Sequence, residues 1–228
     1  MTKPDTQIWS AEAIAVDLEH AIHEHRLPPG TKLGEDELAE AYGISRTIVR
    51  AGLQALSHRR LVELKRNRGA FVAQPSVREA REVFEARALV EPRTARSAAE
   101  RMTEADLDRL NRNIADEHAA LDAGETGQAL LLSGQFHMEI ARIARQATIE
   151  SFISELVARS SLIIALYWRR RAALCETQAH HALLDAFAQR DGDRAEQLMK
   201  EHLLDLLTSL DLRRVQEPPT SLRQALNR

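Results

Sequence analysis

The sequence has almost no cysteine and no long apolar run. Cys175 is the only cysteine in 228 residues, which excludes an intrachain disulfide and a cysteine-based metal cluster. No run approaches the roughly 18 apolar residues of a membrane helix. The start of the chain, MTKPDTQIWS, lacks the basic segment and apolar core of a signal peptide. These absences predict a cytoplasmic protein with no membrane partner.

Aromatic residues are scarce as well, at 4%, whereas 44% of the residues are hydrophobic and 29% are charged. This balance is typical of a soluble globular protein, and the length favours two modest domains over one large domain. The formal net charge is -3. A strongly anionic partner would therefore have to bind to a locally basic surface.

Residues 31–73 carry the pattern of a winged helix-turn-helix. A first helix is predicted to begin near Gly34 and Glu35, and Gly43 supplies the positive φ that a tight turn needs. Ser45 is a good N-cap for a second helix. Two short strands, 61–65 and 70–73, then flank a hairpin tip at residues 66–69.

The second helix and the hairpin tip present the candidate DNA-binding residues. These are Ser45, Arg46, Thr47 and Arg50 on the helix, and Arg66 and Arg68 on the wing. Residues 44–70 hold seven basic residues and one acidic residue, a formal charge of +6. Such a stripe is expected of a protein that binds duplex DNA, whose phosphates supply most of the affinity. The alternative is an ordinary solvated run of charge.

The same stretch resembles the DNA-binding half of the GntR family of bacterial transcription regulators, through LPPGTKLGEDELAE, GISRTIVR and RGAFV. The sequence departs from the family pattern at Asp36, where many relatives place a DNA-contacting arginine, and at Ile48, Ala51 and Gly52. Glycine costs a helix about 1 kcal/mol relative to alanine. Gly52 therefore predicts a close contact between helices.

A further helix is expected at residues 10–25, behind the N-cap candidate Ser10. It carries His20, His23 and His25. Glutamates flank these histidines, and no other metal-ligand side chain is expected at the same depth as they are. We interpret these three histidines as solvated surface rather than as a metal site.

After Ala73 the pattern becomes helical. The predicted segments are 76–101, 103–122, 126–146, 148–170, 174–190 and 193–214. The expected fold is therefore mainly α: a winged helix-turn-helix with a small β wing at residues 1–74, an antiparallel all-α bundle of six or seven helices at 75–215, and a flexible tail at 216–228.

Three histidines of the predicted bundle lie on the apolar stripes of three different helices. His137 shares its face with Ile140 and Ala144, and His180 and His202 lie among leucines in the same way. A single buried histidine is usually an ordinary core residue that has found a hydrogen-bond partner. Three imidazoles on separate inward faces instead indicate the ligand set of a divalent transition metal.

This second half resembles the FCD effector-binding domain of the FadR branch of GntR regulators, through EARALVEP, FHMEI, HHALLDAF and EHL. The resemblance implies metal ligands at His137, His180 and His202, with Ser133 where metal-binding relatives have aspartate. Ser133 would give at most a weak or water-mediated contact. Zn²⁺ is the expected ion, and Ni²⁺ or Mn²⁺ would also suit the site. Arg87 is expected either to bind a small carboxylate effector or to form a surface or interhelical ion pair with Glu91.

Two functions compete at this point. The first is a ligand-responsive transcription regulator, a repressor that binds a pseudo-palindromic operator as a homodimer through its helical domain. The second is a metal-dependent hydrolase built on the three histidines. A hydrolase would need a general base beside the metal, and no acid falls on the His137 face within a turn except Glu139 and Glu150, which point elsewhere by periodicity. A hydrolase would also leave the DNA-binding half unexplained. The first function is therefore preferred.

Overall fold

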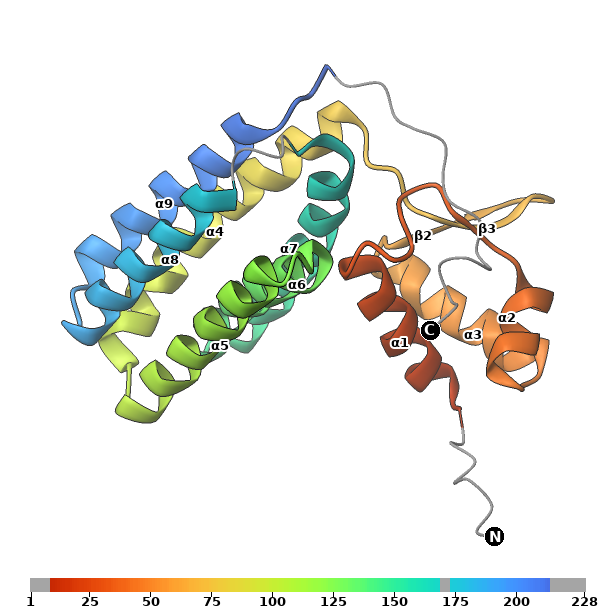
Figure 1. Ribbon diagram of the computed structural model, residues 1–228, viewed down its shortest axis with the longest axis horizontal. Helices are drawn as coiled ribbons and strands as arrows, with labels where there is room; N and C mark the ends of the chain where they lie inside the picture. The colour runs from red at the N-terminus through yellow and green to blue at the C-terminus, as the bar shows by residue number, and fades with distance from the viewer. Residues whose placement is uncertain (1–8, 169–172, 214–228) are drawn as a thin grey trace, which may run out of the picture. The chain divides into compact units, whose positions relative to one another are not determined.

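A computed structural model describes residues 9–168 and 173–213, and the predicted C-terminal tail at 216–228 lies outside the described residues (Figure 1). The chain divides into two compact units, with the boundary between Ala73 and Gln74. Among the described helices, none combines the length and the apolar character that a membrane crossing requires.

Within residues 9–73 the first unit contains three helices and a small sheet (Figure 1). Its elements are α1 (Ala11–His23), β1 (Lys32–Leu33), α2 (Glu35–Tyr42), α3 (Arg46–His58), β2 (Val62–Lys65) and β3 (Gly69–Val72). Ser10 caps α1 by accepting a hydrogen bond from the backbone N–H of Ala13 at 3.1 Å. Gly43 ends α2 with a φ of 65°, so the turn has the predicted glycine geometry.

The core of the first unit is formed by the apolar stripes of its helices and by one face of its sheet. Fully or almost fully buried residues include Ile14, Leu18, Leu38, Val49, Leu53, Leu56, Leu61, Val62 and Val72. The sheet order is β1-β3-β2, and both pairs are antiparallel, with Val62 opposite Val72 and Lys32 opposite Phe71. The sequence did not predict β1, because a strand of two residues is too short to show an alternating pattern.

The second unit is the predicted helical bundle. Over the described part of residues 74–213 its helices are α4 (Val77–Arg101), α5 (Glu104–Asp122), α6 (Thr126–Ile143), α7 (Ala147–Tyr167), α8 (Ala173–Ala188) and α9 (Gly192–Ser209). Ser76 with Glu79, and Thr103 with Asp106, form capping boxes at the starts of α4 and α5. The mainly helical fold and the six helices expected from periodicity are thus confirmed.

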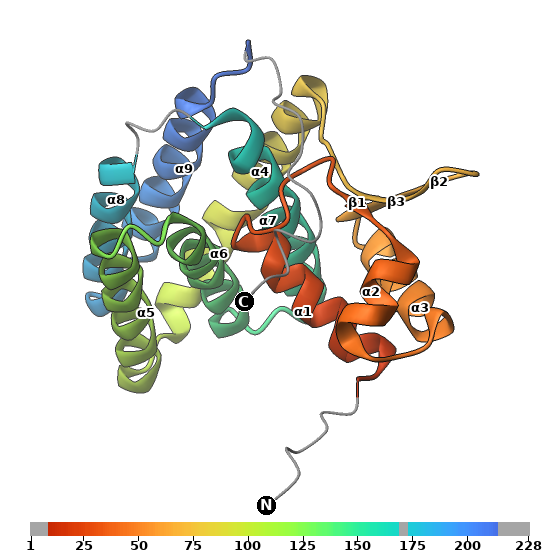
Figure 2. The same ribbon diagram turned by 45° about the vertical axis from the view of Figure 1, so that its right-hand side comes forward.

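α4 is the central helix of this bundle. It packs against α9 along its length and also against α6, α7 and α8, while α5 packs between α6 and α8 (Figures 1 and 2). The core is filled by Phe84, Phe136 and Phe187 and by aliphatic side chains from every helix around them. The inner faces of α4, α5, α6, α8 and α9 bring buried polar residues together in this core.

Candidate functional site

The N-terminal half of α3 presents the predicted base-reading residues. Ser45 caps the helix, and its Oγ accepts a hydrogen bond from the backbone N–H of Ile48 at 3.4 Å. Arg46, Thr47 and Arg50 are all exposed. Because Arg46 and Arg50 are four residues apart on one helix, their guanidinium groups share a face.

Both arginines are ion-paired with the first turn of α2. Arg50 donates from Nε to Glu35 Oε1 at 3.0 Å and from Nη2 to Glu35 Oε2 at 2.6 Å. Arg46 contacts Asp36 Oδ1 at 3.1 Å and Glu35 Oε2 at 3.5 Å. The hydrogen bond from Arg50 lowers the pKa of the Glu35 carboxyl. Sequence reasoning did not predict these pairs, because Glu35 and Arg50 are distant in the chain.

The hairpin between β2 and β3 forms the wing. The backbone N–H of Arg68 donates to the carbonyl of Lys65 at 2.9 Å, and Asn67 takes a left-handed conformation with a φ of 60° that asparagine tolerates well. Arg66 and Arg68 at its tip are exposed. The wing therefore presents two cations to solvent.

Two other bases of the predicted stripe have structural partners. Arg59 at the end of α3 is paired with Glu19, and at 3.2 Å with Glu12, both on α1. Lys65 is 3.0 Å from Glu63 on the same strand. The Arg59 contacts join α1 to α3, and the Lys65 contact lies within β2. Only part of the +6 charge is therefore left for a partner.

One of the three N-terminal histidines, His23 at the end of α1, is not surface, contrary to the sequence interpretation. The Nε2 of His23 is buried and has no hydrogen-bond partner within the described residues. Burial, with smaller effects from His20 and His25, lowers the pKa of His23 to about 4. His20 is exposed, as expected.

The three bundle histidines meet in the core of the second unit. His137 (α6), His180 (α8) and His202 (α9) are each no more than 3% exposed. One nitrogen from each ring lies within 4.8 Å of the other two, and no other such group of histidine, cysteine or acidic side chains occurs among the described residues. The His137 and His202 rings are stacked, with Nε2 atoms 3.2 Å apart.

Two buried glutamates orient these rings. Glu91 on α4 accepts from His137 Nδ1 at 2.6 Å, and Glu117 on α5 accepts from His180 Nδ1 at 3.1 Å. Each contact places the proton on Nδ1 and leaves the Nε2 lone pair facing the other imidazoles. Carboxylates that hold metal-binding histidines in this way are a common feature of metal sites.

Burial and neighbouring charges set the protonation states of the residues in this cluster. Burial lowers the pKa of His137 to about 4, against the opposing effect of Glu91, and burial also lowers the pKa of His202. Burial alone would raise the pKa of Glu91, but Arg87 and His137 outweigh it and lower this pKa to about 2. The imidazoles of His137 and His202 are therefore neutral near pH 7, as metal binding requires.

The geometry fits a divalent metal. A tetrahedral ion with bonds of about 2.0 Å separates its ligand nitrogens by about 3.3 Å, and His137 and His202 already lie at 3.2 Å. The Nε2 of His180 is buried and, within the described residues, has no hydrogen-bond partner. A buried lone pair without a donor is costly, and a shared cation would satisfy it.

Ser133 and Arg87 lie on two helices of this site. Ser133 is buried one turn before His137 on α6. Arg87 is 2% exposed and donates to both Glu91 carboxylate oxygens, at 2.5 and 3.3 Å, and to Ser160 Oγ at 3.0 Å. The ion pair with Glu91 therefore exists, but it is buried and within one helix, not at the surface or between helices as expected.

Sequence reasoning missed the roles of Glu91 and Glu117. It considered only acids near His137 in the chain, whereas both partners come from other helices. The signal for Glu117 was present, since it continues the apolar stripe of Leu110 and Ile114 on α5. No acid of α6 lies on the His137 face, as the sequence predicted, but an acid from another helix does touch His137. Glu91 is nevertheless already engaged by Arg87 and lies on the Nδ1 side of the ring.

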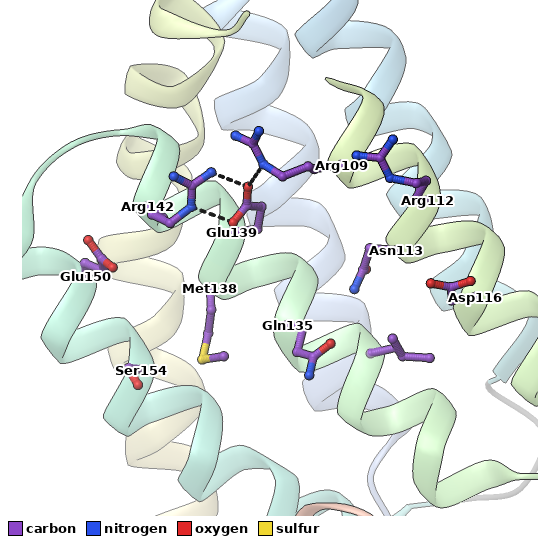
Figure 3. Close-up of a pocket in the computed structure, with 11 residues that line it drawn as sticks. Arg109, Arg112, Asn113, Asp116, Gln135, Met138, Glu139, Arg142, Glu150 and Ser154 are labelled. Atoms are coloured by element: carbon purple, nitrogen blue, oxygen red, sulfur yellow. Dashed lines mark hydrogen bonds and ion pairs between the residues drawn. The ribbon is translucent and has the colours of Figure 1, made fainter. Parts of the chain in front are cut away.

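A hollow of about 670 Å³ lies on α5, α6 and α7, and the three histidines do not line it (Figure 3). Three of its six charged side chains pair with one another. Glu139 accepts from Arg109 at 2.7 Å and from Arg142 at 2.5 and 2.7 Å. The lining holds three arginines and three acids, so its formal charges cancel and favour a ligand of neither sign.

Comparison with known proteins agrees with both halves. The family described as bacterial regulatory proteins, gntR family, matches residues 10–72, and the FCD domain matches residues 82–205. The galactonate operon transcriptional repressor of Escherichia coli K12 is 32% identical, over 82% of this chain and 90% of its own. The HTH-type transcriptional repressor RspR of the same organism is 25% identical, over 85% and 84%.

Solved structures share the fold. The GntR transcriptional regulator of Rhodococcus sp. RHA1 matches with a TM-score of 0.76 at 24% identity, over 87% of this chain and 95% of that one. Escherichia coli McbR/YncC matches with a TM-score of 0.74 at 22% identity. The winged helix, the helical bundle and the family matches together establish that the chain belongs to the GntR family of bacterial transcription regulators, in its FCD-domain branch, and that it is a regulator and not an enzyme.

Proposed function

We propose that this chain is a transcriptional repressor that binds operator DNA through α3 and the wing. The observation that carries this is the exposure of Arg46, Thr47 and Arg50 on one end of α3, together with Arg66 and Arg68 at the wing tip. Arginine on a recognition helix can make two hydrogen bonds to a guanine edge, and wing arginines suit phosphates. Both E. coli relatives reported above are named as repressors.

The proposed active form is a homodimer joined through the helical unit. One α3 and one wing can contact only half of a site, whereas a two-fold symmetric protein on a pseudo-palindrome doubles the contact. Operator half-sites should then be separated by about one helical turn of DNA, or a multiple of it.

The proposed effector site is the histidine cluster with a divalent metal. Zn²⁺ is the first candidate, and Ni²⁺ and Mn²⁺ are the alternatives. His137, His180 and His202 would hold the ion through nitrogen, and Ser133 would contribute at most a weak or water-mediated contact. Bound there, the metal would supply a positive centre with an open coordination position. The formal charges of Arg87, Glu91 and Glu117 leave one net negative charge around the histidines, which favours a divalent cation.

A small carboxylate is the proposed effector. With a divalent ion in place, the same three side chains leave a net positive site, which suits an anion. The observed contacts of Arg87 use three of the five N–H donors of a guanidinium group, so two are left for a carboxylate. One relative is named for the galactonate operon, and galactonate is a carboxylate.

The experiment is a gel-shift titration with the DNA upstream of the chain's own gene. Arg46→Ala or Arg50→Ala should cost about 1 to 3 kcal/mol and relax preference at one base pair. Arg66→Ala should instead weaken binding to all sequences and reduce the salt dependence by about one phosphate contact. Arg78→Ala, which removes an exposed arginine from α4, is the control. Wild-type operator affinity in both the Arg46 and the Arg50 variants would rule out this docking.

A further inference from the structure

Glu35 holds Arg50 by one edge of its guanidinium group. Arg50 donates from Nε to Glu35 Oε1 at 3.0 Å and from Nη2 to Glu35 Oε2 at 2.6 Å. The same Oε2 lies 3.5 Å from Arg46 Nη2, and the Glu35 side chain is only 27% exposed, against 58% for Arg50. As the first residue of α2, Glu35 also lies where a helix favours a negative charge. The carboxylate is therefore a held group that sets the orientation of an exposed arginine.

The other edge of Arg50 is left for a partner. A guanidinium group has five N–H donors, one on Nε and two on each Nη. The two hydrogen bonds to Glu35 use the Nε donor and one Nη2 donor, which leaves two donors on Nη1 and one on Nη2. Nη1 and Nη2 form an edge that matches the O6 and N7 acceptors of guanine. Arg50 can therefore contact a guanine in the major groove without leaving Glu35.

Holding Arg50 in this way should favour a base contact over a phosphate contact. A free arginine side chain loses rotamer freedom when it binds, whereas Arg50 has already lost part of this freedom to Glu35. A phosphate out of line with the Nη edge can be reached only if Arg50 gives up both hydrogen bonds to Glu35. A guanine in line with that edge leaves both hydrogen bonds in place. The pair therefore lowers the cost of the base contact alone.

We propose that Glu35 is a positioning residue that holds Arg50 for bidentate reading of one guanine, and that the Glu35–Arg50 pair stays intact in the operator complex. This inference rests on the proposed function, since it requires that α3 meets DNA. It adds that preference at one base pair depends on an acid outside the recognition helix. The partner is duplex DNA, and the property that changes is the preference for G·C over A·T at that pair.

The test measures fluorescence anisotropy with the operator duplex that the gel shift identifies, and with copies in which each G·C pair is replaced in turn by A·T. The pair that Arg50 reads is the one at which Arg50→Ala loses its preference. Wild type should prefer G·C there about thirtyfold, as two hydrogen bonds to guanine allow. Glu35→Gln removes the charge and one of the two acceptors that face Arg50, so this preference should fall to about fivefold.

Glu37→Gln is the matched control, because it neutralises another acid of the same helical turn at an exposed position. Removing an acid near DNA should strengthen binding to every duplex by a common factor, and such a factor cancels in the preference. An inactive fraction of the protein cancels in the same way. Glu37→Gln should therefore keep the wild-type preference at the Arg50 base pair.

The Arg50→Ala background separates the possible outcomes. With Arg50 absent, Glu35→Gln should change no preference by more than Glu37→Gln does. The inference is overturned if Glu35→Gln keeps or raises the wild-type preference at the Arg50 base pair, or lowers the preference at other pairs as much.

The Arg50→Ala variant alone distinguishes failure of this inference from failure of the proposed function. If Arg50→Ala weakens binding to all duplexes equally, Arg50 contacts a phosphate, so this inference fails while the proposed function stands. If Arg50→Ala changes neither operator affinity nor any base preference, the docking of α3 is wrong and both fail together.

Discussion

Single residues decide how the histidine cluster is arranged. Glu91 and Glu117 each bond an Nδ1 atom, so His137 and His180 turn their Nε2 atoms inward. Each glutamate bonds the Nδ1 side of its ring and so fixes a tautomer and a ring orientation. The candidate metal site thus consists of five side chains on five helices, of which the sequence identified three as candidate ligands.

Glu117→Gln tests this orienting role. The amide oxygen can still accept from His180 Nδ1, but the negative charge that makes the ring a stronger ligand is lost, so Zn²⁺ affinity should fall about tenfold. Competition with a chelating dye measures this affinity. Asp116→Asn, an exposed neighbour on the same helix, should leave it unchanged. Equal affinities in wild type and Glu117→Gln would mean that Glu117 only fills space.

At the scale of elements, Gly52 determines how closely α1 and α3 pack. A Cβ atom added to Gly52 would lie 3.0 Å from the backbone oxygen of Ala11 and 3.4 Å from Ile14 Cγ2. The close helix contact predicted from the sequence is therefore present. Glycine has a poor helix propensity, but a side chain at this position of α3 would push α1 away.

Gly52→Ala should consequently destabilise the protein, although alanine is the better helix former. The gain of about 1 kcal/mol in propensity should be outweighed by displacement of the Ala11 backbone, for a net loss of about 1 kcal/mol. Urea denaturation gives the free energy of unfolding. Ala51→Gly, at an exposed position of the same helix, measures the propensity effect alone. A Gly52→Ala variant more stable than wild type would show that α1 can shift without lowering the free energy of unfolding.

Sequence periodicity predicted the helices well because each has a continuous apolar stripe. It also identified His137, His180 and His202, since an imidazole in an apolar stripe is conspicuous. It could not supply contacts that depend on which helices are neighbours. Glu91 with His137 and Glu35 with Arg50 both join residues from different helices, and nothing in either local sequence identifies the partner.

At the scale of the whole molecule, the proposed DNA-binding unit and the proposed effector unit are proposed to act through a dimer. Light scattering at micromolar concentration should give twice the chain mass of 25.6 kDa, with and without operator DNA. The operator complex should contain two chains per duplex. A monomeric mass under both conditions would contradict the two-fold arrangement proposed for the operator.

The most direct test of a metal-organised pocket in this regulator is the metal content and Zn²⁺ affinity of the full chain, purified without chelator or an immobilised-metal column. Wild type should bind about one Zn²⁺ per chain, and chelator should lower its melting temperature, because an ion that binds only the folded state stabilises it. Ser133→Asp should tighten metal binding by adding a charged oxygen ligand, while weakening any carboxylate that used the open position. His180→Ala should lose the ion. If wild type binds no Zn²⁺, Ni²⁺ or Mn²⁺ while Ser133→Asp does, the histidines are polar pocket lining; if neither binds, the metal site does not exist.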